Sequence, residues 1–315
     1  MPVLRAVVFE AEPLGLFHAE ARGSGLDSWL GGGPRVELDL EVSRVARVGL
    51  LVQEPPSRSV SVAWSPVIAV EGLGDLLCRF HEGPRGEPLS HRYCVNRAVT
   101  RDGYCVLHRG SWKALYERCA QGHEPACLEA HRLNPGEEFA VYVLDYGGSR
   151  VKVGLTQSWR LLWRIAEQPH VAAARVYEGG LLDARETEKR LGRMRLATEG
   201  AAARLEERFR LAAGALTRLQ EEDGWTRAAE RLARMLASLG LEGRFRAYAV
   251  APREPGWLLS ARRVADPVKL LGRRLRVVDY WAGVLAFRGE DGQVMAVHRR
   301  LLQHRLLRGV IREYR

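Results

Sequence analysis

Cysteine and histidine side chains crowd into one short part of this 315-residue chain. All of its cysteines lie between residues 78 and 127, and histidines stand among them. Thiolate sulfur and imidazole nitrogen are the ligands that tetrahedral zinc prefers, whereas disulfides are rare in a reducing cytoplasm. The pattern therefore predicts bound metal. Closed sites with four protein ligands leave no position for a substrate water, so its expected role is structural.

The first candidate ligand set is a pair of knuckles. His91 and Cys94 are separated by two residues, as are Cys105 and His108. An x2 step lets a tight turn direct two ligands at one ion, and the ten residues between the pairs fold back to complete the tetrahedron.

A second candidate set follows at four-residue spacing: Cys119, His123, Cys127 and His131. On one helix such ligands share a face, but consecutive turns do not converge on one ion, so a bend near Pro125 is required. Two zinc ions fit the number of ligands, and Cys78 could substitute for His91 or His123. A single zinc, with the remaining histidines in solvent, is the simpler alternative.

The charge balance favours an acidic partner. Lys plus Arg number 48 and Asp plus Glu 38, for a net charge of +10 and a pI of about 9.7. Arginine, which binds phosphate with two hydrogen bonds, supplies most of the excess. Nucleic acid is the predicted partner, although an arginine-rich composition also follows from a GC-rich genome. Without a long apolar run or a signal peptide, we expect a cytoplasmic protein and no membrane partner.

The elements that must position these residues are mixed. Alternating apolar residues predict strands in residues 36–42 and 60–64, broken by a turn at residues 31–34. From Phe139 a hairpin turning at Gly147 and Gly148 is followed by a helix over 157–167, a strand over 171–177 and a helix from Asp183. Helical stripes continue over 200–239 with a break at Gly224, and strands return from residue 245. The fold class is therefore α+β.

Residues 139–191 carry a resemblance to a known superfamily. The segment contains Phe139-Ala-Val-Tyr142-Val-Leu, then Gly147-Gly148, Lys152-Val-Gly154-Leu-Thr156, Trp159-Arg160, Arg164, Glu167-Gln168 and Glu188. It resembles the GIY-YIG nuclease superfamily in a variant with a KVG-T second motif. It also looks like an uncharacterised family in which a cysteine-rich zinc module precedes such a domain.

These patterns and the resemblance together predict a domain plan. It comprises an N-terminal β domain (1–76), a zinc-binding module (77–136), a GIY-YIG-like domain (137–198), a helical segment (199–243) and a C-terminal β region (244–315). Carried over residue by residue, the resemblance implies a catalytic set of Tyr142, Lys152, Arg164 and Glu188, with Mg²⁺ or Mn²⁺ at Glu188.

This chain departs from the superfamily at Lys152, which stands where the second tyrosine is expected. A protonated ammonium binds phosphate but does not accept a proton from water. Arg160 is a rival to Arg164, and Glu186 is a rival to Glu188. The alternatives are thus a zinc-containing nucleic-acid-binding phosphodiesterase, a non-catalytic adaptor for RNA, the ribosome or a protein partner, and a cysteine-based metal or redox sensor.

Overall fold

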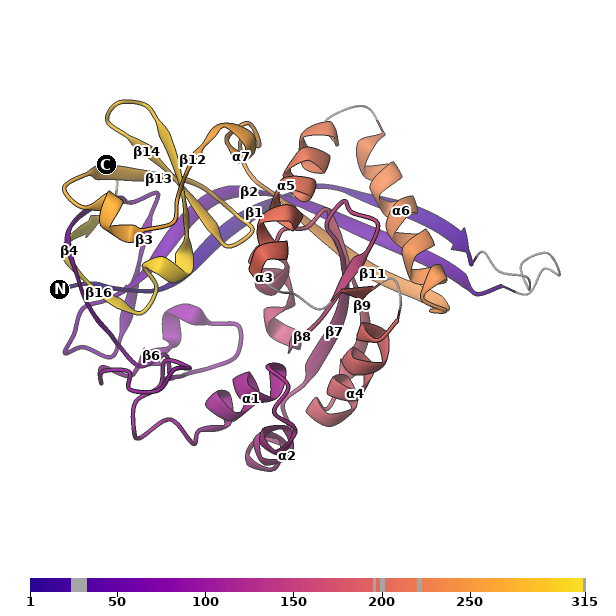
Figure 1. Cartoon of the computed structure of the whole chain (residues 1–315), viewed down its shortest axis with the longest axis horizontal. Helices are drawn as coiled ribbons and strands as arrows, with labels where there is room; N and C mark the ends of the chain where they lie inside the picture. Colours follow the sequence, from indigo (N-terminus) through magenta and orange to yellow (C-terminus); the bar gives the residue numbers. More distant parts are fainter. Residues whose placement is uncertain (24–32, 195–196, 199–201, 220–222, 314–315) are drawn as a thin grey trace. The chain divides into compact units, whose positions relative to one another are not determined.

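The computed structural model describes residues 1–23, 33–194, 197–198, 202–219 and 223–313 (Figure 1). The fold is mixed α+β, as predicted. The chain divides into two compact units. Unit 1 comprises Met1–Glu10, Val45–Pro135 and Ser260–Arg315, and unit 2 comprises Ala11–Arg44 and Gly136–Leu259. The strands β1 (Val3–Arg22) and β2 (Arg35–Gln53) contribute residues to both.

Unit 1 contains an antiparallel sheet built from the two ends of the chain. Its strands follow the order β1-β16-β4-β13-β14-β15. They are β4 (Val67–Leu76), β13 (Arg274–Trp281), β14 (Val284–Gly289), β15 (Val294–His298) and β16 (Arg305–Arg312), and β12 (Arg262–Val264) adds in parallel to β15. β3 (Val60–Trp64) pairs with the end of β2. The N- and C-terminal strand regions, predicted as separate domains, are therefore hydrogen-bonded to each other through β4 and β16.

The cysteine-rich part of unit 1 has little regular structure. A two-residue hairpin pairs β5 (His81–Glu82) with β6 (Arg92–Tyr93). Two helices follow, α1 (Trp112–Ala120) and α2 (Glu124–Leu133). Ser111 caps α1, and Pro125 occupies the first turn of α2, where a missing N–H costs nothing. The predicted bend of this segment is confirmed, because the chain leaves helical structure between the end of α1 and the start of α2.

Unit 2 has the predicted chain order β-β-α-β-α. β7 (Phe139–Asp145) pairs antiparallel with β8 (Val151–Gln157) and β9 (Ala172–Gly179). α3 (Leu161–Ala166) and α4 (Leu181–Gly192) complete the series, and α4 packs on all three strands. Every residue of β7 is buried, because both of its edges are paired and its side chains are largely apolar on both faces; the exception, Asp145, pairs with Arg231.

The remainder of unit 2 extends this sheet. β11 (Gly243–Ala251) pairs antiparallel with β9 and parallel with the first part of β2. The predicted helical stripes form α5 (Ala202–Arg218) and α6 (Gly224–Ser238), which begins at the predicted break. A short helix, α7, covers Trp257–Ser260, and β10 (Ala197–Thr198) pairs with β8.

Residues 31 and 32 of the predicted turn lie outside the described residues. Among the helices that are described, none is long and apolar enough to cross a membrane.

Candidate functional site

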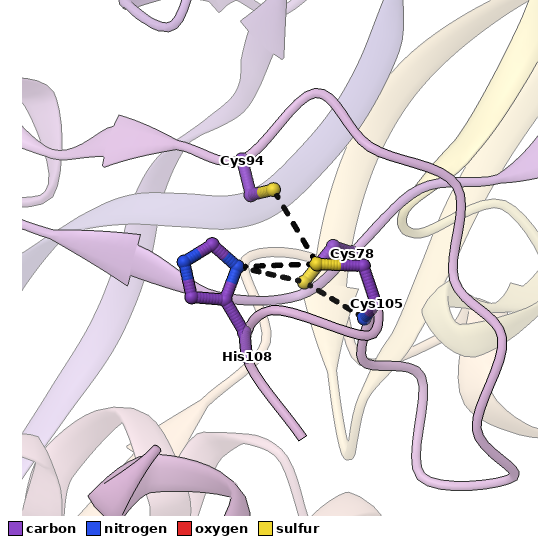
Figure 2. Close-up of side chains that lie close together, drawn as sticks. All are labelled: Cys78, Cys94, Cys105 and His108. Carbon is purple, nitrogen blue, oxygen red and sulfur yellow. Dashed lines mark hydrogen bonds between the residues drawn. The ribbon is translucent and has the colours of Figure 1, made fainter. Parts of the chain in front are cut away.

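Four side chains of unit 1 meet at one point: Cys78, Cys94, Cys105 and His108. Their sulfur and imidazole nitrogen atoms all lie within 4.8 Å of one another (Figure 2). The three cysteines are at most 4% exposed. Buried polar atoms that converge in this way need a common partner. The arrangement is compatible with a metal site.

The separations match a tetrahedron around a single ion. The sulfur atoms of Cys94 and Cys105 lie 3.9 Å apart. Nδ1 of His108 lies 3.3 Å from the Cys105 sulfur and 3.7 Å from the Cys78 sulfur. With metal–sulfur bonds of about 2.3 Å, two corners of a tetrahedron are separated by about 3.8 Å. One ion of zinc's size would therefore reach these ligands with little rearrangement.

The four candidate ligands come from three separate places in the chain. Cys78 follows the end of β4, and Cys94 follows the end of β6. Cys105 and His108 lie at the ends of one tight turn, in which the His108 amide donates to the Cys105 carbonyl at 3.1 Å. The ring of Phe80 stacks on the His108 imidazole at 3.9 Å between centroids, which fixes the ring plane. Only the second predicted knuckle, Cys105-x2-His108, is a local turn.

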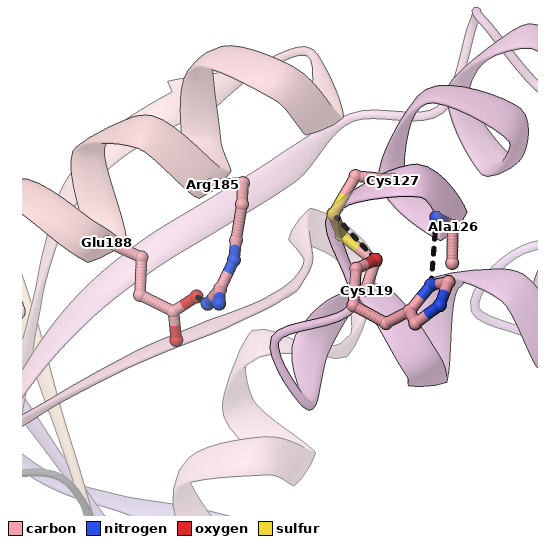
Figure 3. The surroundings of a disulfide bond; sticks show 6 residues. Cys119, Ala126, Cys127, Arg185 and Glu188 are labelled. Carbon is pink, nitrogen blue, oxygen red and sulfur yellow. Dashed lines mark hydrogen bonds and ion pairs between the residues drawn. A yellow bond between two sulfur atoms is a disulfide. The ribbon is translucent and has the colours of Figure 1, made fainter.

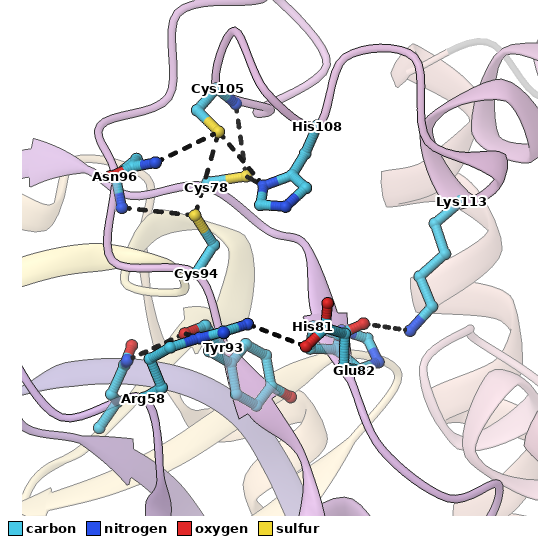
Figure 4. A network of polar contacts seen from close by, with 11 residues as sticks. Arg58, Cys78, His81, Glu82, Tyr93, Cys94, Asn96, Cys105, His108 and Lys113 are labelled. Carbon is cyan, nitrogen blue, oxygen red and sulfur yellow. Dashed lines mark hydrogen bonds and ion pairs between the residues drawn. The ribbon is translucent and has the colours of Figure 1, made fainter.

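Backbone and side-chain N–H groups point at the sulfur atoms. The amide of Cys105 lies 3.3 Å from the Cys78 sulfur, and that of Asn96 lies 3.5 Å from the Cys94 sulfur (Figure 4). The side-chain amide of Asn96 lies 3.9 Å from the Cys105 sulfur. Such donors stabilise thiolates, as outer-shell partners do in metal sites.

Burial governs the protonation of the ligands. It raises the pKa of the Cys78 thiol to about 12 and also raises the pKa of Cys94. Burial raises the pKa of Cys105 too, but hydrogen bonds from the His108 amide and from Cys78 outweigh it, so that this pKa is lowered. Burial lowers the pKa of His108, which keeps its imidazole neutral and able to bind metal. A metal must therefore displace thiol protons, and its binding should strengthen as pH rises.

His91 does not belong to this cluster, which corrects the predicted ligand set. Its Nε2 lies 2.9 Å from the carbonyl oxygen of Pro84, and its ring stacks on His81 at 4.5 Å. The chain from His91 to Cys94 is extended through β6, and residues three apart on an extended chain point to opposite sides. Cys78 takes the fourth position, which the sequence left open for it.

The second predicted ligand set is also corrected. Cys119 and Cys127 are joined by a disulfide, with their Cα atoms 4.7 Å apart (Figure 3). His123 turns onto its own helix, where its Nδ1 accepts a hydrogen bond from the Ala126 amide at 3.3 Å. His131 lies in the last turn of α2. The turn between α1 and α2 brings the two sulfurs together, so neither is a thiolate available to a second zinc ion.

A polar cluster in unit 2 contains the predicted catalytic set. Gln168 lies at its centre and donates from Nε2 to the Tyr142 hydroxyl at 2.6 Å and to the Arg164 carbonyl at 2.9 Å. Nζ of Lys152 donates to the other side-chain atom of Gln168, Oε1. The positive charges of Lys152 and Arg164 both act on the carboxylate of Glu188. β7, β8, α3 and α4 thus bring Tyr142, Lys152 and Arg164 to Gln168, and Glu188 lies within the influence of the two cations.

The structure also separates the rival residues. Both arginines pair with Glu167, Arg160 at 3.5 Å and Arg164 at 3.3 Å, and Arg164 in addition influences Tyr142 and Glu188. Glu188 is 16% exposed in its side chain and forms an ion pair of 2.5 Å with Arg185 (Figure 3). Glu186 is exposed to solvent. Burial raises the pKa of Glu188, and hydrogen bonding and charge from Arg185 oppose that rise.

Tyr142 fits tightly against the second motif. A Cβ added at Gly154, its cross-strand partner, would collide with the phenol ring and hydroxyl. Glycine is therefore required there for Tyr142 to lie across β8. The side chain is fully buried, and burial raises the pKa of its hydroxyl. The phenol therefore stays neutral near pH 7.

His170 fixes the backbone that presents Gln168. Its Nδ1 lies 2.7 Å from the Gln168 carbonyl, and its Nε2 lies 3.1 Å from the Val250 amide. The amide requires Nε2 as acceptor, so Nδ1 carries the proton and the ring is neutral. Burial lowers the pKa of His170 to about 4.

This pairing predicts a pH dependence of stability. In the unfolded chain His170 regains a pKa near 6.5, so between that value and about 4 the unfolded state binds more protons. The contribution of the neutral His170 to the free energy of unfolding is present above about pH 6.5. It falls as the pH drops, and the loss is about 2 kcal/mol at pH 5. Urea unfolding at pH 7.5 and at pH 5 should show this loss. In the His170→Asn variant the free energy of unfolding should fall by about 2 kcal/mol less between these pH values than it does in the wild type. An unchanged pH dependence in the variant would contradict the assignment.

Sequence reasoning assigned no role to one member of the unit 2 cluster, Gln168. Gln168 stands in the quoted Glu167-Gln168 pair, but no charge or metal-binding chemistry singled it out. Arg185 precedes Glu188 by three residues, a helical spacing that predicts the observed ion pair.

Comparisons with known proteins gave no relative: no family model matches the chain, and no curated protein or solved structure matches it.

Proposed function

We propose that this chain is a zinc-containing nucleic-acid-binding protein whose GIY-YIG-like domain, residues 137–198, binds and cleaves a phosphodiester backbone. The observation that carries the proposal is the meeting of Tyr142, Lys152 and Arg164 at Gln168, with the carboxylate of Glu188 under the influence of both cations. These residues are distant in sequence, and they lie on four different elements, β7, β8, α3 and α4.

Topology supports the same proposal. Three antiparallel strands lie in the sheet in the order β8-β7-β9. Along the chain α3 follows β8 and α4 follows β9, which gives the β-β-α-β-α order expected of the domain. Gly154 explains the glycine of the KVG motif, because only glycine leaves room for Tyr142. A net charge of +10 provides long-range attraction to nucleic acid.

The proposed metal of unit 1 is zinc with a structural role. Three sulfurs and one imidazole nitrogen form a soft donor set that favours Zn²⁺ over Mg²⁺ or Ca²⁺. The ligands fill all four tetrahedral positions. The region around them has a small core of Cys78, Cys94, Cys105, Tyr104 and Ala114, with Phe80 against it. Metal binding would supply stability that so little apolar burial does not.

Glu188 is the residue that would hold Mg²⁺ or Mn²⁺ in unit 2. One carboxylate is an adequate protein contribution for Mg²⁺, which keeps water ligands and takes further oxygens from phosphate. When bound, the cation supplies neutralisation of charge on the phosphate. Arg185 now occupies one oxygen of this carboxylate, so it must turn away or contact the phosphate itself.

The other residues of the cluster bind and orient. Lys152 donates to Gln168 as an ammonium, and together with Arg164 it offers positive charge to phosphate oxygens. Tyr142 stays protonated and accepts the Gln168 hydrogen bond, which fixes the amide between Lys152 and the phenol. Lys152 therefore serves as a phosphate ligand rather than as a general base.

Binding should depend on Arg164. We expect Arg164→Gln to weaken affinity for duplex, branched and single-stranded substrates by about tenfold and to lower the salt dependence by roughly one ion. Arg246→Gln, which removes an exposed arginine from β11, is the matched control. Fluorescence anisotropy over a range of salt concentrations measures both quantities. Equal effects of the two substitutions would mean that only overall charge matters and would remove the unit 2 cluster from the account.

A second candidate function is a non-catalytic adaptor on structured RNA, the ribosome or another protein partner. Two observations favour it. The Tyr142 hydroxyl is buried and engaged by Gln168, which leaves it little access to an attacking water. Glu188 is already neutralised by Arg185. Salt-sensitive binding without cleavage by any variant would establish this function.

A further inference from the structure

Arg5 is a fully buried charge in unit 1. Its side chain is 0% exposed, and its guanidinium donates hydrogen bonds in several directions. Nη1 donates to the carbonyl of Cys78 at 2.9 Å, and Nη2 donates to the carbonyl of Cys94 at 2.6 Å. Nε donates to the side chain of Gln53 at 2.6 Å. The two carbonyls belong to two of the four residues of the metal cluster.

These partners are all neutral. Besides the carbonyls and Gln53, Nη1 lies 3.3 Å from Nδ1 of His304, and the guanidinium lies 5.1 Å from the centre of the Tyr93 ring. Within the described residues, no aspartate or glutamate pairs with Arg5. An isolated buried cation is costly, and natural proteins pair it with an opposite charge. The opposite charge must come from another kind of group.

The metal centre provides that charge. Three thiolates and one neutral imidazole around a divalent ion carry a net charge of −1, which equals and opposes the charge of Arg5. The two charges are close, because the guanidinium binds the backbone of two of the thiolate residues.

We propose that Arg5 is the counter-charge and the positioning residue of the metal centre. The inference rests on the zinc centre proposed above. The two Nη groups of the Arg5 guanidinium donate to the carbonyls of Cys78 and Cys94. These two residues come from separate segments after β4 and β6 and share no local turn. The first pair of ligands is therefore set by Arg5, whereas the second pair is set by the turn between Cys105 and His108.

The test compares zinc affinity among full-length variants. Arg5→Gln removes the charge and the paired hydrogen bonds of the guanidinium, whereas Arg5→Lys keeps the charge. The control, Arg305→Gln, removes an arginine that donates to the Gly74 carbonyl, away from the ligands. Zinc affinity is measured by competition with a chromophoric chelator, and the cobalt-substituted proteins are compared by their sulfur-to-metal charge-transfer absorption.

We expect Arg5→Gln to weaken zinc binding by 10- to 100-fold, the range typical of outer-shell partners, and to shift the cobalt charge-transfer band. Arg5→Lys should recover part of the affinity, and Arg305→Gln should bind zinc as the wild type does. If Arg5→Gln is too unstable to purify, the difference between Arg5→Lys and wild type decides. Zinc affinity within twofold of wild type in the Arg5 variants would overturn the proposal while leaving the zinc centre intact. A wild-type protein that binds no zinc would overturn both.

Discussion

Replacing Cys105 by serine is expected to abolish zinc binding and to lower the melting temperature of the protein sharply. Cys105 is central in the cluster, because its sulfur lies 3.9 Å from that of Cys94 and 3.3 Å from Nδ1 of His108. A serine hydroxyl does not replace a thiolate as a zinc ligand. Apparent zinc-binding energies in small modules reach about 10 kcal/mol, so the surrounding loops should lose their order.

The matched control is His91→Gln. It removes the histidine that spacing favoured as a ligand and that the structure directs to the Pro84 carbonyl. This variant should keep one zinc per chain, measured by inductively coupled plasma mass spectrometry, and should release it to a chelator at the wild-type rate. If Cys105→Ser retained zinc and melted like the wild type, or if His91→Gln lost zinc, the assignment of the four ligands would be wrong.

Glu188→Gln is expected to reduce metal-dependent cleavage of nucleic acid by at least 100-fold while leaving binding within a few-fold of wild type. The substitution keeps the shape and the hydrogen-bonding ability of the side chain. It removes a negative charge on which Lys152, Arg164 and Arg185 all act. Removal of one electrostatic contributor to a reacting phosphate typically costs 10²- to 10³-fold in rate.

Glu186→Gln is the control for this experiment. It changes the same charge on the same helix, α4, but at an exposed position two residues away. Both variants are assayed on duplex, branched and single-stranded DNA and RNA with Mg²⁺ or Mn²⁺. Equal activity of Glu188→Gln and wild type would exclude the cation role of Glu188. Wild-type binding with no cleavage of any substrate would leave the adaptor function in its place.

Local patterns predicted the elements of unit 2 well. The hairpin of β7 and β8 is marked by its two glycines, and α4 by its acidic first turn, so both are encoded by neighbouring residues. The pairing partners of the outer strands are not encoded by neighbouring residues. β1 and β16 lie at opposite ends of the chain and pair through Val3 and Leu306. Such long-range pairing leaves no signature within a short window of sequence, which is why the terminal strands were predicted as separate domains.

The candidate metal ligands show the same division. The turn from Cys105 to His108 is local, and spacing identified it. Cys78 joins from sixteen residues before Cys94, and only packing of the strand ends reveals that it replaces His91. Arg5 lies further still from its partners and carries no motif. Spacing identifies ligands that share a turn, whereas ligands and outer-shell partners from separate strands require the fold.

The measurement that tests the central claim most directly is zinc K-edge X-ray absorption on the purified protein, combined with its zinc content. One zinc per chain with three sulfur ligands at about 2.3 Å and one nitrogen at about 2.0 Å is the predicted result, with Cys78, Cys94, Cys105 and His108 as ligands. Two zinc ions per chain would place Cys119 and Cys127 on metal instead of in a disulfide. A metal-free protein, or a site with two sulfurs and two nitrogens, would contradict the account.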